Sequence, residues 1–180
     1  MPKELDSAKI VAALRGATEE VFSTMLGMAI TAGEPSRQPS RPEPVNGVVA
    51  LIGLTGPWVG TGGISCTADF ARKLSGQLLM SEFSSIDQEV LDAIGEITNM
   101  IIGSFKNLLE AEIGMLEMSI PVVVFGHNFT AASIHRTDWV VLPFECASEL
   151  LVVKACLAPQ TEQHNRRATD VHAPISQVVV

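Results

Sequence analysis

The spacing of apolar residues along the chain predicts three helices. Apolar residues recur at intervals of three or four over residues 7–30, over residues 68–80 and over a long segment that ends near Glu112. Ser85 is the expected N-cap of the long helix, and Gln88 is its expected capping-box partner. Acidic residues in the first turn of this helix suit the helix dipole.

Alternating or β-branched residues predict six strands. The predicted strands cover residues 48–54, 58–67, 120–125, 131–135, 139–144 and 149–157. A Gly56-Pro57 turn makes the first two a hairpin, and turn-forming residues at 126–128 separate two of the later ones. Because the order of elements has no regular βαβ repeat, it predicts an α+β fold, with a mainly antiparallel sheet covered on one face by helices.

Two segments show neither helical nor strand spacing. Residues 31–44 contain four prolines, which cannot sustain a helix or a central strand, so they predict a loop. Residues 159–180 are mostly polar and unpatterned, and they predict a flexible tail. The sequence therefore predicts one domain over residues 1–158.

Composition and charge narrow the classes of function. The chain of 180 residues is 47% hydrophobic and 18% charged, which indicates a packed globular domain. Its formal charge of −8, with no cluster of Lys and Arg, argues against a nucleic-acid partner and favours a protein or a small ligand. No run approaches the roughly 18 continuous apolar residues of a membrane-spanning helix. The first ten residues carry both charge signs and do not resemble a signal peptide, so we expect a cytoplasmic protein without membrane contact.

The cysteines suggest no cross-link or metal. Cys66, Cys146 and Cys156 are odd in number and form no CxxC pair. We expect reduced, mostly buried thiols.

The long helix has two distinct faces. One apolar stripe predicted to face the core consists of Val90, Ile94, Ile97, Ile101, Phe105 and Leu108. Asp92, Glu96, Asn99 and Gly103 follow steps of four, three and four, and they form a second stripe roughly opposite. A glycine inside a helix costs about 1 kcal/mol against alanine, which is reasonable where something approaches the helix closely. Gly95 is a second low-profile position on this helix.

An acid and an amide on the outer face of a helix are usually only solvated. The other constellations are weaker still. Gly60-x-Gly62-Gly63 lacks the context of a nucleotide site and is expected to serve a hairpin turn. His127 and His135 have no matching ligand cluster, so a metal site is not expected. Ser65 and Ser119 have no GxSxG motif or partner histidine that would suggest a catalytic triad.

The string DAIGEITNMIIG gives the outer stripe a more specific meaning. Asp92-x-x-x-Glu96-x-x-Asn99, followed later by Pro121, resembles the signature of CheX-like phosphatases in the CheC/CheX/FliY chemotaxis family. The segments ATEEVFSTMLGM, VVALIGLTGPWVGTGGISCT and PVVVFG also resemble segments of that family, so the resemblance covers about residues 7–158.

Two features depart from the family pattern. The 21 residues between Asn99 and Pro121 are one fewer than the pattern has. CheC relatives carry a second copy of the signature on the first helix, whereas here Glu20 is followed three positions later by Ser23 instead of Asn. The resemblance therefore implies one active surface per chain, as in CheX.

The resemblance implies an activity and a partner. The expected reaction is removal of the aspartyl phosphate from a phosphorylated CheY-like response regulator. Asn99 would position the attacking water and Glu96 would pair with a receiver-domain lysine, with Asp92, Gly95, Gly103 and Pro121 as the supporting face. No cofactor of its own is expected, because Mg²⁺ would come with the receiver domain, and a homodimer is expected.

Two other functions remain open. One is a noncatalytic receiver-binding protein of the same fold, similar to a flagellar-switch scaffold. The other is a ligand sensor that uses a groove beside the glycine-rich hairpin. Loss of phosphate from a receiver domain in the presence of the protein separates the phosphatase from both.

Overall fold

The computed structural model describes residues 5–39, 44–130 and 138–160. The helices are α1 (Ser7–Val21), a π-helical turn η1 (Phe22–Leu26), α2 (Ala68–Leu79) and α3 (Gln88–Ile113). The strands are β1 (Thr31–Ala32), β2 (Ser36–Gln38), β3 (Pro44–Thr55), β4 (Trp58–Cys66), β5 (Glu117–Met118), β6 (Val122–Thr130), β7 (Trp139–Cys146) and β8 (Glu149–Pro159). No helix within these ranges has both the length and the apolar character needed to cross a membrane.

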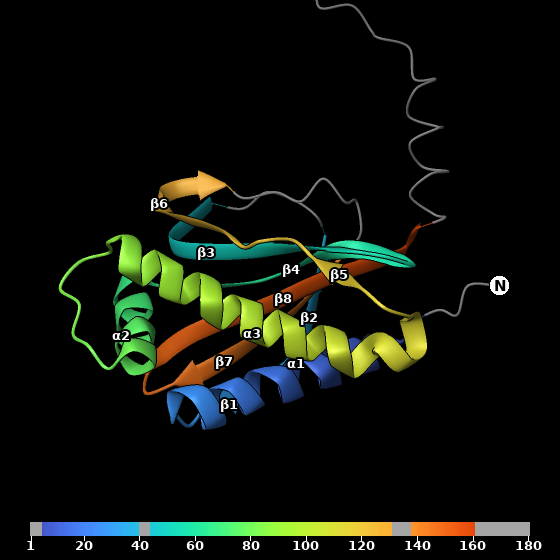
Figure 1. Cartoon of the computed structure of the whole chain (residues 1–180), viewed down its shortest axis with the longest axis horizontal. Coiled ribbons are helices and arrows are strands. Elements are labelled where there is room, and N and C mark those ends of the chain that lie inside the picture. Colours follow the sequence, from blue (N-terminus) through green and yellow to red (C-terminus); the bar gives the residue numbers. More distant parts are fainter. Residues whose placement is uncertain (1–4, 40–43, 131–137, 161–180) are drawn as a thin grey trace, which may run out of the picture.

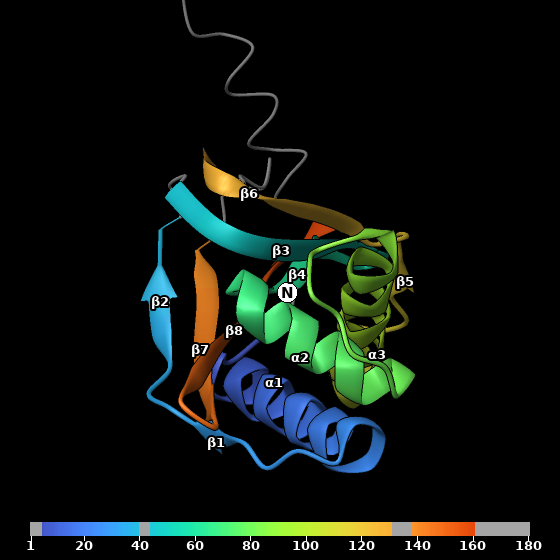
Figure 2. The ribbon, with the colours of Figure 1, turned by 90° about the vertical axis from the view of Figure 1, so that its left-hand side faces the viewer.

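The strands form one curled antiparallel sheet. Its centre runs in the order β7, β8, β4, β3. β1 and β2 both pair with the outer side of β7, while β5 and β6 both pair with the outer side of β3. The sheet curves around the helices, so that α3 lies between α1 on one side and β6 on the other (Figures 1 and 2). The predicted α+β fold, with helices on one face of an antiparallel sheet, is confirmed.

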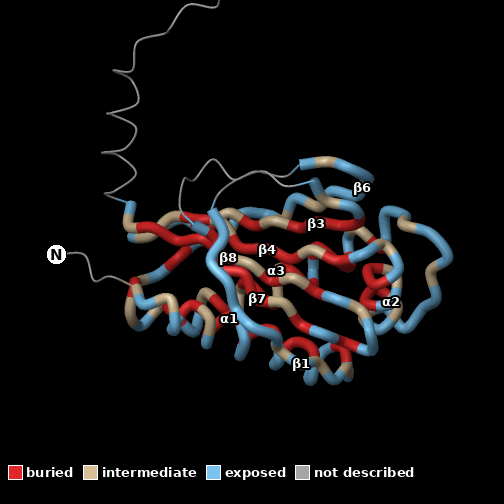
Figure 3. The backbone as a smooth tube through the Cα atoms, turned by 180° about the vertical axis from the view of Figure 1, so that it is seen from behind, coloured by how far each residue is buried: buried red, intermediate tan, exposed pale blue. Residues whose placement is uncertain are grey.

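Helix α3 forms the centre of the hydrophobic core. It packs against α1, α2, β3, β4 and β6. Ile94, Ile97, Ile101 and Phe105 are fully buried, as their spacing predicts. Leu108 is the exception, because it is 56% exposed and lies over Gly16 of α1, whereas Leu109 is only 3% exposed. Figure 3 shows that buried backbone follows the strands and helix faces around this core, whereas β6 and the α2–α3 connection are largely exposed.

Glycine in β4 brings α3 close to the sheet. A Cβ atom on Gly62 would lie 2.8 Å from Cδ1 of Ile102, so a larger residue would push the helix away. The prediction that the Gly60-x-Gly62-Gly63 segment serves a hairpin turn is wrong, because all three glycines lie within β4. The turn itself is at Gly56-Pro57.

Several element boundaries differ from the prediction. The first helix is α-helical only to Val21, and it ends after η1 at Gly27, whose φ of 62° is left-handed. The predicted loop 31–44 contains β1 and β2, because an exposed edge strand tolerates neighbouring prolines that a central strand does not. Asp87, not Ser85, caps α3, since its Oδ1 accepts a 3.0 Å hydrogen bond from the Val90 amide.

The predicted break at residues 126–128 is a β-bulge inside β6. Two β6 residues, His127 and Asn128, face the single residue Asn46 of β3. The Asn46 Oδ1 accepts a 2.8 Å hydrogen bond from the Asn128 amide, and Asn128 has a φ of 51°. Turn-forming residues therefore bend the strand without ending it. The predicted strand 131–135 and most of the predicted tail lie outside the described residues, and β8 continues to Pro159.

Ile97→Asp should unfold the domain, whereas Asp92→Ala should leave it folded. A charge placed at the fully buried position 97 has no partner, and it costs several kcal/mol, comparable with the stability of a whole domain. Asp92 is exposed, so its loss removes little packing. Circular dichroism melts of both variants test this, and equal melting temperatures would contradict the helix orientation.

A polar face on the central helix as a candidate functional site

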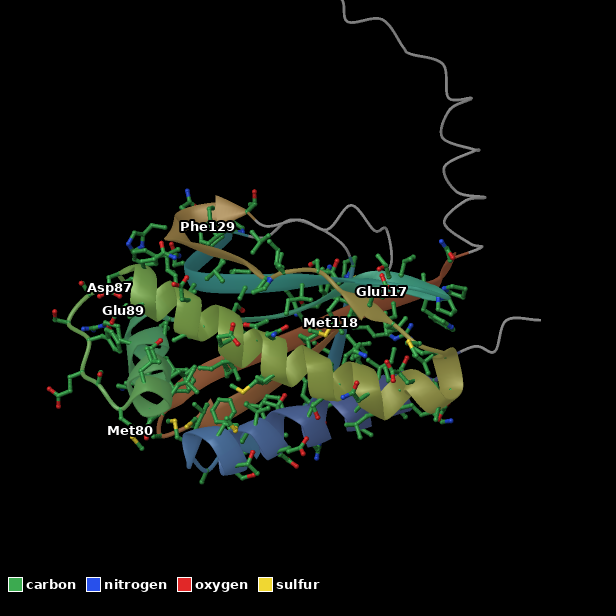
Figure 4. The ribbon with its side chains drawn as sticks, in the orientation of Figure 1. Met80, Asp87, Glu89, Glu117, Met118 and Phe129 are labelled. Atoms are coloured by element: carbon green, nitrogen blue, oxygen red, sulfur yellow. The ribbon has the colours of Figure 1, made fainter. Side chains whose placement is uncertain are left out.

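The outer side of α3 carries the candidate residues. Asp92 and Glu96 are exposed, and Asn99 and Gly103 are half-buried. Glu96 and Asn99 are three residues apart on the helix, so their side chains are neighbours on one face. The stripe predicted from the sequence is therefore present as one continuous surface. Figure 4 shows the amino-terminal end of this helix at Asp87 and Glu89.

The side chains of Glu96 and Asn99 are available to another molecule. Gln88 Nε2 donates a 2.7 Å hydrogen bond to Asp92 Oδ1, which engages one oxygen of that carboxylate. Within the described ranges, neither the Glu96 carboxylate nor the Asn99 amide has a hydrogen bond or ion pair. A docking molecule would not have to break internal bonds to reach them.

The structure brings Gly95 and Pro121 together. A Cβ atom on Gly95 would lie 3.4 Å from Pro121 Cγ and 3.5 Å from Val123 Cγ2. Gly95 is buried, and the chain that enters β6 packs directly on it. Gly95 is therefore not an open low-profile position. This contact fixes β6 beside the turn of α3 that carries Glu96 and Asn99.

Gly103 faces β5, a strand that the spacing of apolar residues did not predict. A Cβ atom there would lie 3.8 Å from Met118 Sδ, in β5. Figure 4 shows Met118 beside the middle of α3. Strand β5 has only two residues, so it leaves no alternating pattern to detect. Met118 of the same chain therefore makes the close approach that the glycine at position 103 suggested.

The face is acidic along the first half of the helix. Glu89, Asp92 and Glu96 occur there without a lysine or arginine between Gln88 and Phe105. The first basic residue of α3 is Lys106, whose Nζ bonds to Glu110 Oε1 at 2.5 Å. This hydrogen bond lowers the pKa of Glu110. The acidic face is therefore suited to a cationic group on a partner.

Exposed apolar residues lie where the chain enters β6 and along that strand. Ile120 is 84% exposed and Val122 is 60% exposed, on either side of Pro121. Val124 and Phe125 are also exposed. Val123 contacts Gly95 of α3, so Phe125 lies on the same side of the strand, whereas Val122 and Val124 point to the other face of the sheet. The pocket beside α2 and the groove beside α1 include no residue of α3, so this face is not part of either cavity.

Glu20 on α1 stands where CheC relatives have the acid of their second signature, and its side chain is hydrogen-bonded within the domain. Ser104 Oγ on α3 donates a 2.7 Å hydrogen bond to Glu20 Oε2. Ser23, which stands where CheC relatives have Asn, turns its hydroxyl to the Glu20 carbonyl oxygen at 3.1 Å. Both side chains are thus used within the domain, consistent with one active surface per chain.

Ser119 and His127 make structural contacts within the domain. Ser119 Oγ accepts a 2.9 Å hydrogen bond from the Gly53 amide and so fixes β5 to β3. The ring of His127 meets Phe125 edge to face, and His135 lies outside the described residues. No group of three or more His, Cys, Asp or Glu in the described chain could hold a metal ion.

All three cysteines are free and buried, as predicted. Burial, together with the Glu149 carboxylate, raises the pKa of Cys66 to about 12. Its thiol is therefore protonated and unreactive near neutral pH.

Comparison of the sequence with known proteins finds a matching family model and a similar curated protein. The family model of the chemotaxis phosphatase CheX matches residues 48–145, which is more than half of the chain. The CheY-P phosphatase CheX of Thermotoga maritima is 32% identical over 127 residues, which cover 70% of this chain and 81% of that protein.

Solved structures give the same result. The chemotaxis protein CheX from Desulfovibrio desulfuricans has a TM-score of 0.76 and 27% identity, over 83% of this chain and 99% of the other. A CheC-like superfamily protein from Shewanella sp. PV-4 has a TM-score of 0.73 and 27% identity, over 83% and 97% of the two chains.

Gly103→Ala should stabilise the domain. Alanine gains about 1 kcal/mol over glycine inside a helix, and its Cβ would make only an ordinary contact with Met118. We expect the melting temperature to rise by about 2–4 °C. Gly95→Ala is the matched comparison, where the tighter fit against Pro121 should reduce the gain. A lower melting temperature for Gly103→Ala would show that Met118 cannot adjust.

Proposed function

Because the chain belongs to the CheX family of chemotaxis phosphatases, we propose that it hydrolyses the aspartyl phosphate of a CheY-like receiver domain. The substrate class follows from the Thermotoga maritima relative, which is a CheY-P phosphatase. The observation that carries the proposal is the pair Glu96 and Asn99, which lies on an accessible face of α3 and has no partner among the described residues.

The reaction transfers a phosphoryl group to water. Water attacks phosphorus, the bond between phosphorus and the aspartyl oxygen breaks, and inorganic phosphate and an aspartate carboxylate result. Such transition states are loose, so catalysis depends mainly on placing the water in line. The Asn99 carboxamide oxygen can accept a hydrogen bond from that water. Being neutral, the amide adds no negative charge beside the phosphoryl oxygens.

Glu96 serves recognition in this proposal. Its carboxylate lies one turn before Asn99 and can pair with a lysine of the receiver domain. That pairing would orient the complex so that Asn99 enters the receiver's phosphorylation site. The receiver domain would supply Mg²⁺, so this chain needs no metal of its own.

The shape of the site supports a shared active centre. The polar face lies on the outside of a helix, beside the exposed chain that enters β6 at Pro121. Such a face can dock on a protein but cannot enclose a small phosphate ester. The receiver would contribute the phosphoryl group and its cavity, and this chain would contribute the water-positioning amide. Self-association as a dimer stays a prediction.

Asn99→Ala should abolish hydrolysis while leaving folding and receiver binding nearly intact. Loss of a positioning group costs about 100-fold or more in rate. The matched control is Asn107→Ala, an exposed asparagine two turns further along α3. Phosphate loss from an acetyl-phosphate-loaded CheY-like receiver measures the rate, and calorimetry measures binding. Hydrolysis by Asn99→Ala at the unmodified rate would refute the role of Asn99. Binding without hydrolysis by the unmodified chain would instead support a scaffold protein.

Glu96→Gln should weaken receiver binding. Removing one charge of a pair that docking buries costs about 2 kcal/mol or more, while the glutamine keeps the shape of the side chain. Glu145→Gln, an exposed residue of β7, is the control and should bind normally. Titration calorimetry at low and high salt measures the affinities. Equal affinities for the two variants would mean that Glu96 does not dock the receiver.

A further inference from the structure

A groove runs along the outer side of α1, away from the polar face of α3. Residues 7–19 of α1 form one wall, residues 35–37 form the other, and Val140 of β7 also lines it. In Figure 2, β2 and β7 stand on one side of α1. The groove has a volume of about 830 Å³, within the range of ligand sites. Its α1 wall is about 18 Å long at 1.5 Å per residue.

The helix wall of the groove contains a row of small apolar residues. Ala8, Ala12 and Gly16 recur every four residues and therefore lie in one row, with Val11 beside them. Among the described residues, no asparagine, glutamine or aromatic side chain lines the groove. An alkyl chain lying on this row would gain apolar contact and would need no hydrogen-bond partner.

The cations of the groove differ from the others in the described chain. Four described cations form ion pairs, namely Lys9, Arg72, Lys73 and Lys106. Lys154 lies over the Trp139 ring. Arg15 and Arg37 form no ion pair with any described residue, and both line this groove. In a chain with a formal charge of −8, two unpaired guanidinium groups in one groove favour an anion there.

The two arginines lie at different points along the apolar row. Arg37 Nη2 donates a hydrogen bond to Ser7 Oγ, which holds its guanidinium at the amino-terminal end of α1. Asp6 is also at that end, and its Oδ1 caps α1 by accepting a hydrogen bond from the Ala8 amide. Arg15 lies two turns further along, and Glu19 is the one acidic residue that lines the groove.

We propose that this groove binds an elongated apolar molecule with one carboxylate, of the fatty-acid class. The alkyl chain lies along the row of Ala8, Ala12 and Gly16, and the carboxylate pairs with Arg37 or Arg15. The site is separate from Glu96 and Asn99, so binding can be measured without a receiver domain.

Titration calorimetry of the full chain with decanoate and with decanol tests the site. Decanoate should bind saturably at one site per chain, and more tightly than decanol. Arg15→Gln combined with Arg37→Gln should weaken decanoate binding about fivefold, as expected for a partly exposed charge pair, and leave decanol unchanged. Ala12→Leu fills the row and should weaken both ligands about tenfold. Ala111→Leu, at an exposed site on α3, is the control and should bind normally.

The location is tested by the amide chemical shifts of Ala12 and Gly16, which should move on addition of decanoate. Equal affinity for decanoate and decanol would overturn the proposal, as would unchanged binding by Ala12→Leu. Absence of saturable binding below the micelle concentration would overturn it too, and so would a groove that takes an acidic peptide but not decanoate.

Discussion

The close seating of α3 on the sheet is the constraint on which the rest of the structure depends. Ile102 reaches the sheet only because Gly62 has no side chain. Ile94, Ile97 and Ile101 are fully buried in the same hydrophobic core, and each such side chain is worth about 1.5–3 kcal/mol. A helix held this firmly cannot rotate about its own axis. Burial of its apolar face therefore fixes which side chains face outward.

This seating prepares the polar face for its proposed function. The residues between Glu96 and Asn99 are Ile97 and Thr98, which are both fully buried. The backbone that carries the two polar side chains therefore cannot turn away, and only their own rotamers are free. A site built on a rigid element in this way positions its groups more accurately than a site on a loop. Glu20 on α1 is a contrasting case. It faces a neighbouring helix, and its carboxylate accepts a hydrogen bond from Ser104 of α3.

The sequence predicted what strong periodicity determines. The fold class follows from the order of the predicted elements, and the orientation of α3 and the shared face of Glu96 and Asn99 follow from spacing within one helix. Contacts between distant segments could not be read in the same way. The approach of Met118 to Gly103 depends on a two-residue strand, and the burial of Gly95 depends on where Pro121 arrives. The bulge at Asn128 shows that turn-forming residues specify a local backbone shape, and pairing with β3 decides whether the strand continues.

The outward position of the polar face has a consequence for selectivity in the cell. Nucleotides and sugar phosphates far outnumber any one phosphorylated protein, and an enzyme with a phosphate pocket must exclude them by shape or charge. Under the proposed mechanism this chain does not need to exclude such metabolites. A free phosphate ester would meet only one amide and several acidic side chains on the outside of a helix, which do not form a binding pocket. The protein could then be abundant without draining those metabolites. A change of partner would require new residues around Asn99 and not a new phosphate pocket, so the water-positioning amide could stay as it is.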